Sequence, residues 1–205
     1  MRSPAWCATL AGLTVATACS SGSPGDVSPP TPVAAAGLSI AGRERHYDVT
    51  GASVEALRDA MRRHGPTDHD GGRRDALTMW DMEWTYRDRR TAAGCELRDV
   101  RVTLNITVTL PRWTPTAGAS ARLARSWSTF LERVQVHEAG HRAIAEQSAR
   151  DLVAALSSLR GTSCQELWDR AARTATQVVE AGRAKNRAYD VETKHGQTQG
   201  VVLGP

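Results

Sequence analysis

The chain has few aromatic residues and no cluster of basic ones. Aromatic side chains make up 5% of its 205 residues, with a single phenylalanine. The formal net charge is +4, but the arginines are interspersed with Asp and Glu along every segment. Nucleic-acid binding leaves an electrostatic footprint of clustered cations, which is missing here. The sequence therefore predicts no nucleic-acid partner.

The chain also lacks a long apolar run at its start. Arg2 is followed by an uncharged, mildly apolar stretch that is too short for a transmembrane helix and is typical of a signal peptide over residues 1–18. It ends in Ala-Thr-Ala before Cys19, which satisfies the small-x-small cleavage rule and resembles the bacterial lipobox. Residues 19–42 are rich in Ser, Gly and Pro, and we expect them to form a disordered tether.

These features predict an exported protein. In one interpretation, Cys19 is lipidated and anchors the chain on the outer face of the cell membrane, as part of the cell envelope. In the other, the protein is simply secreted with a disordered N-terminus.

Cysteine is scarce, with four in the chain. Cys7 leaves with the signal peptide, and Cys19 is lipidated or lies at the terminus. The remaining two, Cys95 and Cys164, are predicted to form a disulfide in an oxidising compartment, closing a loop of about 70 residues. The alternative is two buried free thiols.

The rest of the composition is typical of a globular domain, with 40% hydrophobic and 23% charged residues. We expect one domain over residues 43–198 and a disordered tail over 199–205. A short amphipathic helix follows Ser53 as its N-cap. Strict alternation of apolar and polar residues predicts strands over 80–86 and 100–110, paired as an antiparallel hairpin with its turn at 91–94.

The C-terminal half has helical periodicity. A helix over about 119–159 would measure about 60 Å if unbroken, so we expect a bend or break in it. A capping box begins at Ser163 and opens a second helix that reaches Tyr189 and should pack antiparallel to the first. The predicted fold is α+β, with a small antiparallel sheet packed on a pair of long helices.

The sequence His137-Glu138-Ala139-Gly140-His141 lies within the first long helix. Residues four apart share a helix face, so the two imidazoles can bind one Zn²⁺ while Glu138 takes a proton from a zinc-bound water. Both histidines fall on the apolar stripe of the helix. A satisfied pair of core histidines is the alternative. The pattern favours metal-assisted hydrolysis.

A catalytic zinc site normally has three protein ligands and one open position. The extended form of the motif, with a third histidine in the same stretch, is missing after His141. The third ligand must therefore come from further along the chain. By spacing alone, Asp190, Glu192 or His195 could supply it, because the antiparallel second helix returns this segment toward the histidines.

Two motifs together carry a family resemblance: His-Glu-x-x-His at 137–141, and Tyr-Asp-x-x-Thr-x-His-Gly at 189–196. With them the chain resembles a family of predicted secreted bacterial zinc-dependent proteases that is described as a domain of unknown function. The similarity covers residues 43–196, including Cys95 and Cys164. It implies a zincin-like fold and a zinc metallopeptidase activity on protein or peptide substrates.

Within that resemblance we assign His137, His141 and His195 to the metal, with Asp190 as a supporting partner or competing ligand. Glu138 is the general base, and Tyr189 is a candidate to stabilise the oxyanion or else the apolar end of the second helix. The strand over 100–110, if it lies at the sheet edge, could pair with an extended substrate.

Two other functions stay open. The first is a non-catalytic envelope lipoprotein whose zinc is structural and closed by a fourth ligand, acting as a binding module. The second is hydrolysis of a non-peptide amide in the cell wall.

Overall fold

The computed structural model describes residues 37–204 and shows a mixed α+β fold with one small sheet and three α-helices. The expected signal peptide, Cys19 and most of the expected tether lie outside these residues. The α+β class is therefore confirmed.

The sheet is mixed rather than antiparallel. Its long strands are β1 (Leu38–Gly51), β2 (Leu77–Thr91) and β3 (Gly94–Pro115), in the order β1-β3-β2. The predicted hairpin is confirmed, because β2 and β3 pair antiparallel across the turn between Thr91 and Gly94. However, β1 pairs parallel to β3. The chain runs back along β2 and forward again along β3, so β1 and β3 point the same way.

The position of β3 corrects another expectation. We predicted that the strand over 100–110 could lie at the edge and receive a substrate, whereas β3 is the central strand and pairs on both sides. Alternation of apolar and polar residues identifies a strand and its buried face, but it does not identify the neighbours of that strand. The short strand β4 (Arg160–Gly161) also pairs with β3, near the hairpin turn.

The folded domain begins earlier than residue 43. Strand β1 starts at Leu38, whose side chain is buried in the core and whose Cα lies opposite that of Val102. Residues 38–42 therefore belong to the sheet and not to the tether. The physical reason is that Leu38 and Ile40 contribute apolar side chains to the core, although the flanking Ala and Gly residues give a weak strand signal.

The three helices are α1 (Val54–His64), α2 (Ala121–Ser158) and α3 (Cys164–Thr193). Predicted N-caps are confirmed at Ser53, which accepts from the amide of Ala56, and at Ser163, which accepts from the amide of Glu166. None of the helices within residues 37–204 is both long and apolar enough to cross a membrane.

Helix α2 is continuous from Ala121 to Ser158, so the alternative of a break was wrong. Its 38 residues span about 57 Å. The 22 residues of β3 span about 73 Å at about 3.3 Å per residue. An unbroken helix therefore has a sheet of matching length to lie on, and the domain is elongated where we assumed a compact shape.

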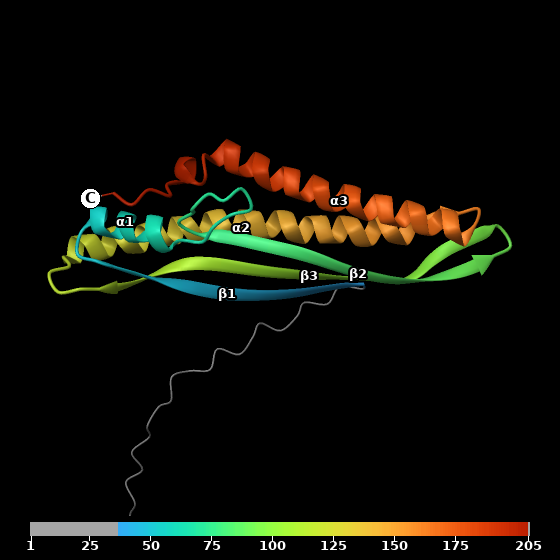
Figure 1. Cartoon of the computed structure of the whole chain (residues 1–205), viewed down its shortest axis with the longest axis horizontal. Helices are drawn as coiled ribbons and strands as arrows, with labels where there is room; N and C mark the ends of the chain where they lie inside the picture. Colours follow the sequence, from blue (N-terminus) through green and yellow to red (C-terminus); the bar gives the residue numbers. More distant parts are fainter. Residues whose placement is uncertain (1–36, 205) are drawn as a thin grey trace, which may run out of the picture.

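All three helices lie on one side of the sheet (Figure 1). The face of β3 toward the helices carries buried apolar residues, among them Val102, Leu104 and Ile106. The opposite face carries polar side chains such as Thr103 and Asn105, and no helix of the described chain covers it (Figure 1). An antiparallel or mixed sheet with one solvated face requires this alternation.

The apolar core consists of two clusters that α2 connects. One includes Leu104, Leu152 and Leu167, and the other includes Leu57, Phe130 and Leu203. The second cluster corrects the expected disordered tail over 199–205. After α3 the chain forms a 3₁₀ turn, η1 (Gln197–Gln199), and then buries Leu203 to 3% exposure. The tail packs because its segment Val-Val-Leu supplies apolar side chains, of which Val201 and Leu203 join this cluster.

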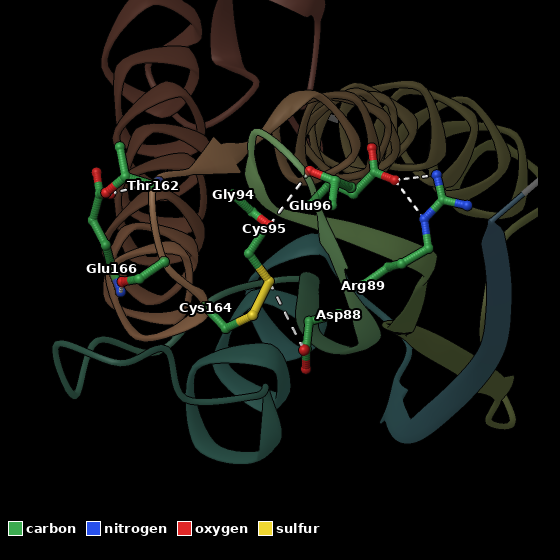
Figure 2. The surroundings of a disulfide bond; sticks show 10 residues. Asp88, Arg89, Gly94, Cys95, Glu96, Thr162, Cys164 and Glu166 are labelled. Carbon is green, nitrogen blue, oxygen red and sulfur yellow. Dashed lines mark hydrogen bonds and ion pairs between the residues drawn. A yellow bond between two sulfur atoms is a disulfide. The ribbon is translucent and has the colours of Figure 1, made fainter.

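The predicted disulfide is present. Cys95 at the start of β3 is bonded to Cys164 at the start of α3, with a Cα separation of 5.1 Å (Figure 2). The bond joins the sheet to the second long helix at the end of the molecule that contains the hairpin turn (Figure 1).

Candidate metal centre

His137 and His141 lie one turn apart on α2 and face the interior. Their side chains are buried, with exposed fractions of 5% and 8% for the residues. The two Nε2 atoms are 3.3 Å apart, and the rings are nearly perpendicular at 83°. Residues at i and i+4 stack on one helix face, so α2 by itself brings the two nitrogens to a common point.

Asp190 approaches the same point from α3. Its Oδ1 atom lies 3.3 Å from Nε2 of His137 and 3.2 Å from Nε2 of His141. Burial alone would raise the pKa of Asp190, but hydrogen bonds from both histidines outweigh it and hold that pKa below its usual range. One carboxylate oxygen and two imidazole nitrogens therefore form a compact set of donor atoms that could bind a metal ion.

His195, which we preferred as the third ligand, is placed differently. Its Nδ1 atom lies 3.3 Å from Oδ1 of Asp190, and 49% of its side chain is exposed. It does not join the cluster that His137, His141 and Asp190 form. The structure thus brings Asp190, our alternative ligand, to the histidine pair, and places His195 beyond it. Glu192 is exposed and outside the cluster.

The backbone after α3 explains why His195 turns aside. Lys194, His195 and Gly196 have φ values of 50°, 53° and 81°, a left-handed conformation that costs non-glycine residues about 1–2 kcal/mol each. Thr193 holds the turn, since its hydroxyl donates to the carbonyl of Tyr189 (2.7 Å) and accepts from the amide of Gly196 (3.2 Å). At Gly196 a Cβ atom would lie 3.0 Å from Cγ of His137, so glycine lets the turn pack on the ring.

Glu138 lies beside the histidines and is 5% exposed. The hydroxyl of Thr78, in β2, donates to its Oε2 atom at 2.7 Å. Burial raises the pKa of Glu138 above its ordinary value, opposed by this hydrogen bond and by the charges of His141 and His137. A buried carboxyl with a raised pKa is suited to accept and hold a proton.

Tyr189 does not face the space in front of the histidines. Its ring stacks on His137 at a centroid distance of 5.1 Å, and its hydroxyl lies 3.3 Å from the backbone carbonyl of His137. Gly140 allows this contact, because a Cβ atom there would lie 2.2 Å from the hydroxyl. This orientation gives no support to the oxyanion role, and Tyr189 instead packs against the rings of His137 and His141.

Two carboxamides that the sequence analysis missed hold the outer nitrogens of the histidines. Gln199 Oε1 lies 2.9 Å from Nδ1 of His137, and Asn186 Oδ1 lies 2.7 Å from Nδ1 of His141. Asn186 could have been found, because it precedes Asp190 by one turn on the same face of α3. No sequence signal pointed to Gln199, which lies past the left-handed turn.

A cavity of about 250 Å³ opens in front of the cluster. Residues of α2, of α3 and the segment after it, and of β2 and the loop that leads into it line this cavity. Asp68 organises this loop by accepting from the amide of Gly72 (2.7 Å) and from Nε of Arg74 (2.7 Å). The lining residues are Asp68, Arg73, Arg74, Asp75, Ala76, Leu77, Val134, His137, Glu138, His141, Asp190, His195, Gln197 and Val201.

Fold and site together define an α+β protein with a buried His-His-Asp cluster at the wall of a cavity. By sequence the chain belongs to a family described as "Bacterial protein of unknown function (DUF922)", which matches residues 44–196. This confirms a bacterial family of unknown function; the protease activity stays a prediction. Comparisons with curated proteins and with solved structures found no match.

Proposed function

We propose that this protein is a zinc-dependent metallopeptidase with a zincin-like site. One observation carries the proposal: the donor atoms of His137, His141 and Asp190 meet at the wall of a cavity that Glu138 also lines. Three ligands, an adjacent carboxyl and an accessible space are the parts that a catalytic zinc site needs.

The donor set fits zinc. Both Nδ1 atoms face carboxamide oxygens, so each ring donates there and keeps the Nε2 lone pair for a metal. Two imidazoles and one carboxylate are a ligand set of catalytic zinc sites, in which a fourth position stays open. When bound, zinc would lower the pKa of a water molecule and polarise the scissile carbonyl.

Glu138 supplies the proton transfer. Thr78 occupies Oε2, which leaves Oε1 to take a proton from the attacking water. Burial has already raised the pKa of this carboxyl, so it can hold that proton and later give it to the leaving amine.

We also propose that β2 receives the substrate, in place of the strand over 100–110. The strand pairs with β3 on one side, and no described strand pairs with its other edge. It enters beside the cavity, where Leu77 lines the wall and Thr78 contacts Glu138. An extended peptide could add to this edge by main-chain hydrogen bonds.

A second candidate is a non-catalytic envelope lipoprotein that uses a structural zinc site as a binding module. The observation that favours it is the position of His195, which lines the same cavity and contacts Asp190. As a fourth protein ligand it would close the open position.

The test is Glu138→Gln in the mature protein, measured as zinc content and as cleavage of a broad peptide library. Gln is nearly isosteric but cannot take the proton, so zinc should stay at the wild-type level while hydrolysis falls by a factor of about 100 or more. Glu132→Gln, at an exposed position of the same helix, is the matched control. A wild-type protein that binds zinc and cleaves nothing in the library would favour the structural site.

We propose an envelope location, with a lipid anchor at Cys19 or simple secretion. Cys19→Ser should release the protein from the membrane fraction if the anchor is used. An unchanged distribution between membrane and soluble fractions would favour secretion.

A further inference from the structure

Three hydrogen bonds form a closed cycle behind His137. The ring Nδ1 atom contacts Gln199 Oε1 at 2.9 Å, and Gln199 Nε2 donates to the hydroxyl of Tyr189 at 3.0 Å. That hydroxyl in turn lies 3.3 Å from the backbone carbonyl of His137. The cycle therefore begins and ends on the same histidine.

Donor and acceptor chemistry orients the Gln199 carboxamide. The Tyr189 hydroxyl has one hydrogen and two acceptors at 3.3 Å, the carbonyl of His137 and Oε1 of Gln199, and both oxygens only accept. The hydroxyl also accepts from the Gln199 amide nitrogen, which turns the amide oxygen toward the ring. An oxygen facing Nδ1 requires a proton on Nδ1, and the Nε2 atom is left as the acceptor.

We propose that Gln199 is a positioning residue that holds His137 in the orientation and tautomer that bind the metal. The inference rests on the proposed zinc site and adds a residue to it. Gln199 lies beyond residue 196, where the match to the family ends. The segment after the matched region thus completes the metal centre of this chain.

The segment after α3 is anchored at both ends, so it can hold Gln199 against His137. Leu203 is buried in the second core cluster, and its carbonyl accepts from Arg58 Nη2 in α1 at 2.5 Å. At the other end of the tail, the amide of Val201 donates to the carbonyl of Gly196 at 3.0 Å. Gln199 is therefore held between two anchored points.

The Nδ1 atom of His141 also faces a carboxamide oxygen, which comes from a different part of the chain. Asn186 Oδ1 faces this Nδ1 atom, and Asn186 Nδ2 donates to the carbonyl of Gly182 at 3.3 Å. Here the carboxamide belongs to α3 and needs no tail. Two histidines of one site thus have the same kind of partner, one from a helix and one from the segment after it.

The test is the zinc affinity of the mature protein, measured by competition with a chromophoric chelator. Gln199→Met keeps the length of the side chain and removes the acceptor, so zinc should bind about 10–100-fold more weakly, the range for loss of such a partner. Gln199→Glu keeps an acceptor for Nδ1 and should therefore recover most of the zinc affinity that Gln199→Met loses. Gln177→Met, at an exposed position of α3, is the matched control and should bind as the wild type does.

A second measurement separates positioning from a general role in stability. After removal of zinc with chelator, Gln199→Met and Gln199→Glu should both stay folded at the assay temperature, as circular dichroism measures, so that a difference in their zinc affinity does not come from unfolding. Wild-type affinity in Gln199→Met, or a loss that Gln199→Glu shares, would overturn the inference. A wild type that binds no zinc would instead overturn the proposed function, and this inference with it.

Discussion

Two buried glutamates in different regions show how the same side chain serves two purposes. Glu96, at the disulfide end, accepts from Arg89 Nε and Arg98 Nη2, both at 2.7 Å, and Arg160 lies 3.3 Å from its other oxygen. Figure 2 shows Glu96 and Arg89 beside the disulfide. Hydrogen bonds from Arg89 and Arg98 hold the pKa of Glu96 below its ordinary value.

Glu138, at the candidate metal centre, has a hydroxyl as its partner and no arginine. Burial raises its pKa where arginines lower that of Glu96. At the disulfide end Glu96 is paired with Arg89, Arg98 and Arg160, and these ion pairs join β2, β3 and β4. At the metal centre the donor atoms are left directed at a common point. The difference separates a structural cluster from the candidate catalytic site.

The largest expected effect is the loss of a proposed ligand from the candidate metal centre. His141→Ala should lower zinc affinity by more than about 100-fold, beyond the range for supporting partners. The fold should persist, because the disulfide end is untouched. Zinc stoichiometry after gel filtration measures the loss of zinc binding, and circular dichroism measures whether the fold persists. A variant that keeps one zinc per chain would remove His141 from the site.

Removing the disulfide should lower the stability of the fold and leave zinc binding unchanged, the reverse of the effect of His141→Ala. In Cys95→Ser with Cys164→Ser, the free energy of unfolding should fall by about 2–4 kcal/mol, because the bond closes a loop with a sequence separation of 69. Zinc affinity should stay at the wild-type value. Denaturant unfolding and chelator competition are the two measurements. A large change in zinc affinity would show that the two regions are coupled.

The third ligand can be decided by a pair of variants. Asp190→Ala should lower zinc affinity as His141→Ala does, since Asp190 Oδ1 is within 3.3 Å of both histidines. His195→Ala should have a smaller effect, because His195 contacts Asp190 from an exposed position. The reverse ranking in the competition assay would restore His195 as the ligand.

The smallest expected effect concerns the pH dependence of stability. The folded-state pKa of Glu96 is lowered, so its contribution is present above the ordinary glutamate value of about 4.3 and is lost as pH falls through the folded-state pKa. Glu96→Gln should therefore lower stability at pH 7. The stability of this variant should also decrease less than that of the wild type as the pH falls. In metal-free protein, Glu138→Gln should not lower stability at pH 7, because it removes a buried charge. Thermal unfolding between pH 7 and pH 3 distinguishes the two.

The sequence predicted the local features best, because they depend on near neighbours. The N-caps at Ser53 and Ser163, the hairpin turn and the pair His137 and His141 follow from spacings of a few residues. The pairing of Cys95 with Cys164 followed from the absence of other candidates in the domain. The order of strands and the continuity of α2 depend on contacts across the whole domain, which spacing does not contain.

The rest of the candidate site was hidden for a similar reason. Asp190 and His195 are close in sequence, and the left-handed turn between Thr193 and Gly196 decides which of them meets the histidines. Thr78 contacts Glu138 across 60 positions of sequence. Such contacts exist only once the helices pack on the sheet.

The order of the site residues along the chain has a consequence for biosynthesis. His137 is made before Gln199, which lies 62 positions later. At 5–20 residues per second, roughly 3–12 s of translation separate the two. The histidine pair therefore exists before α3 and the tail can fold back onto it. If the site binds zinc as proposed, a nascent chain should hold zinc weakly until that later segment arrives, which delays the assembly of the proposed site until most of the domain has been synthesised.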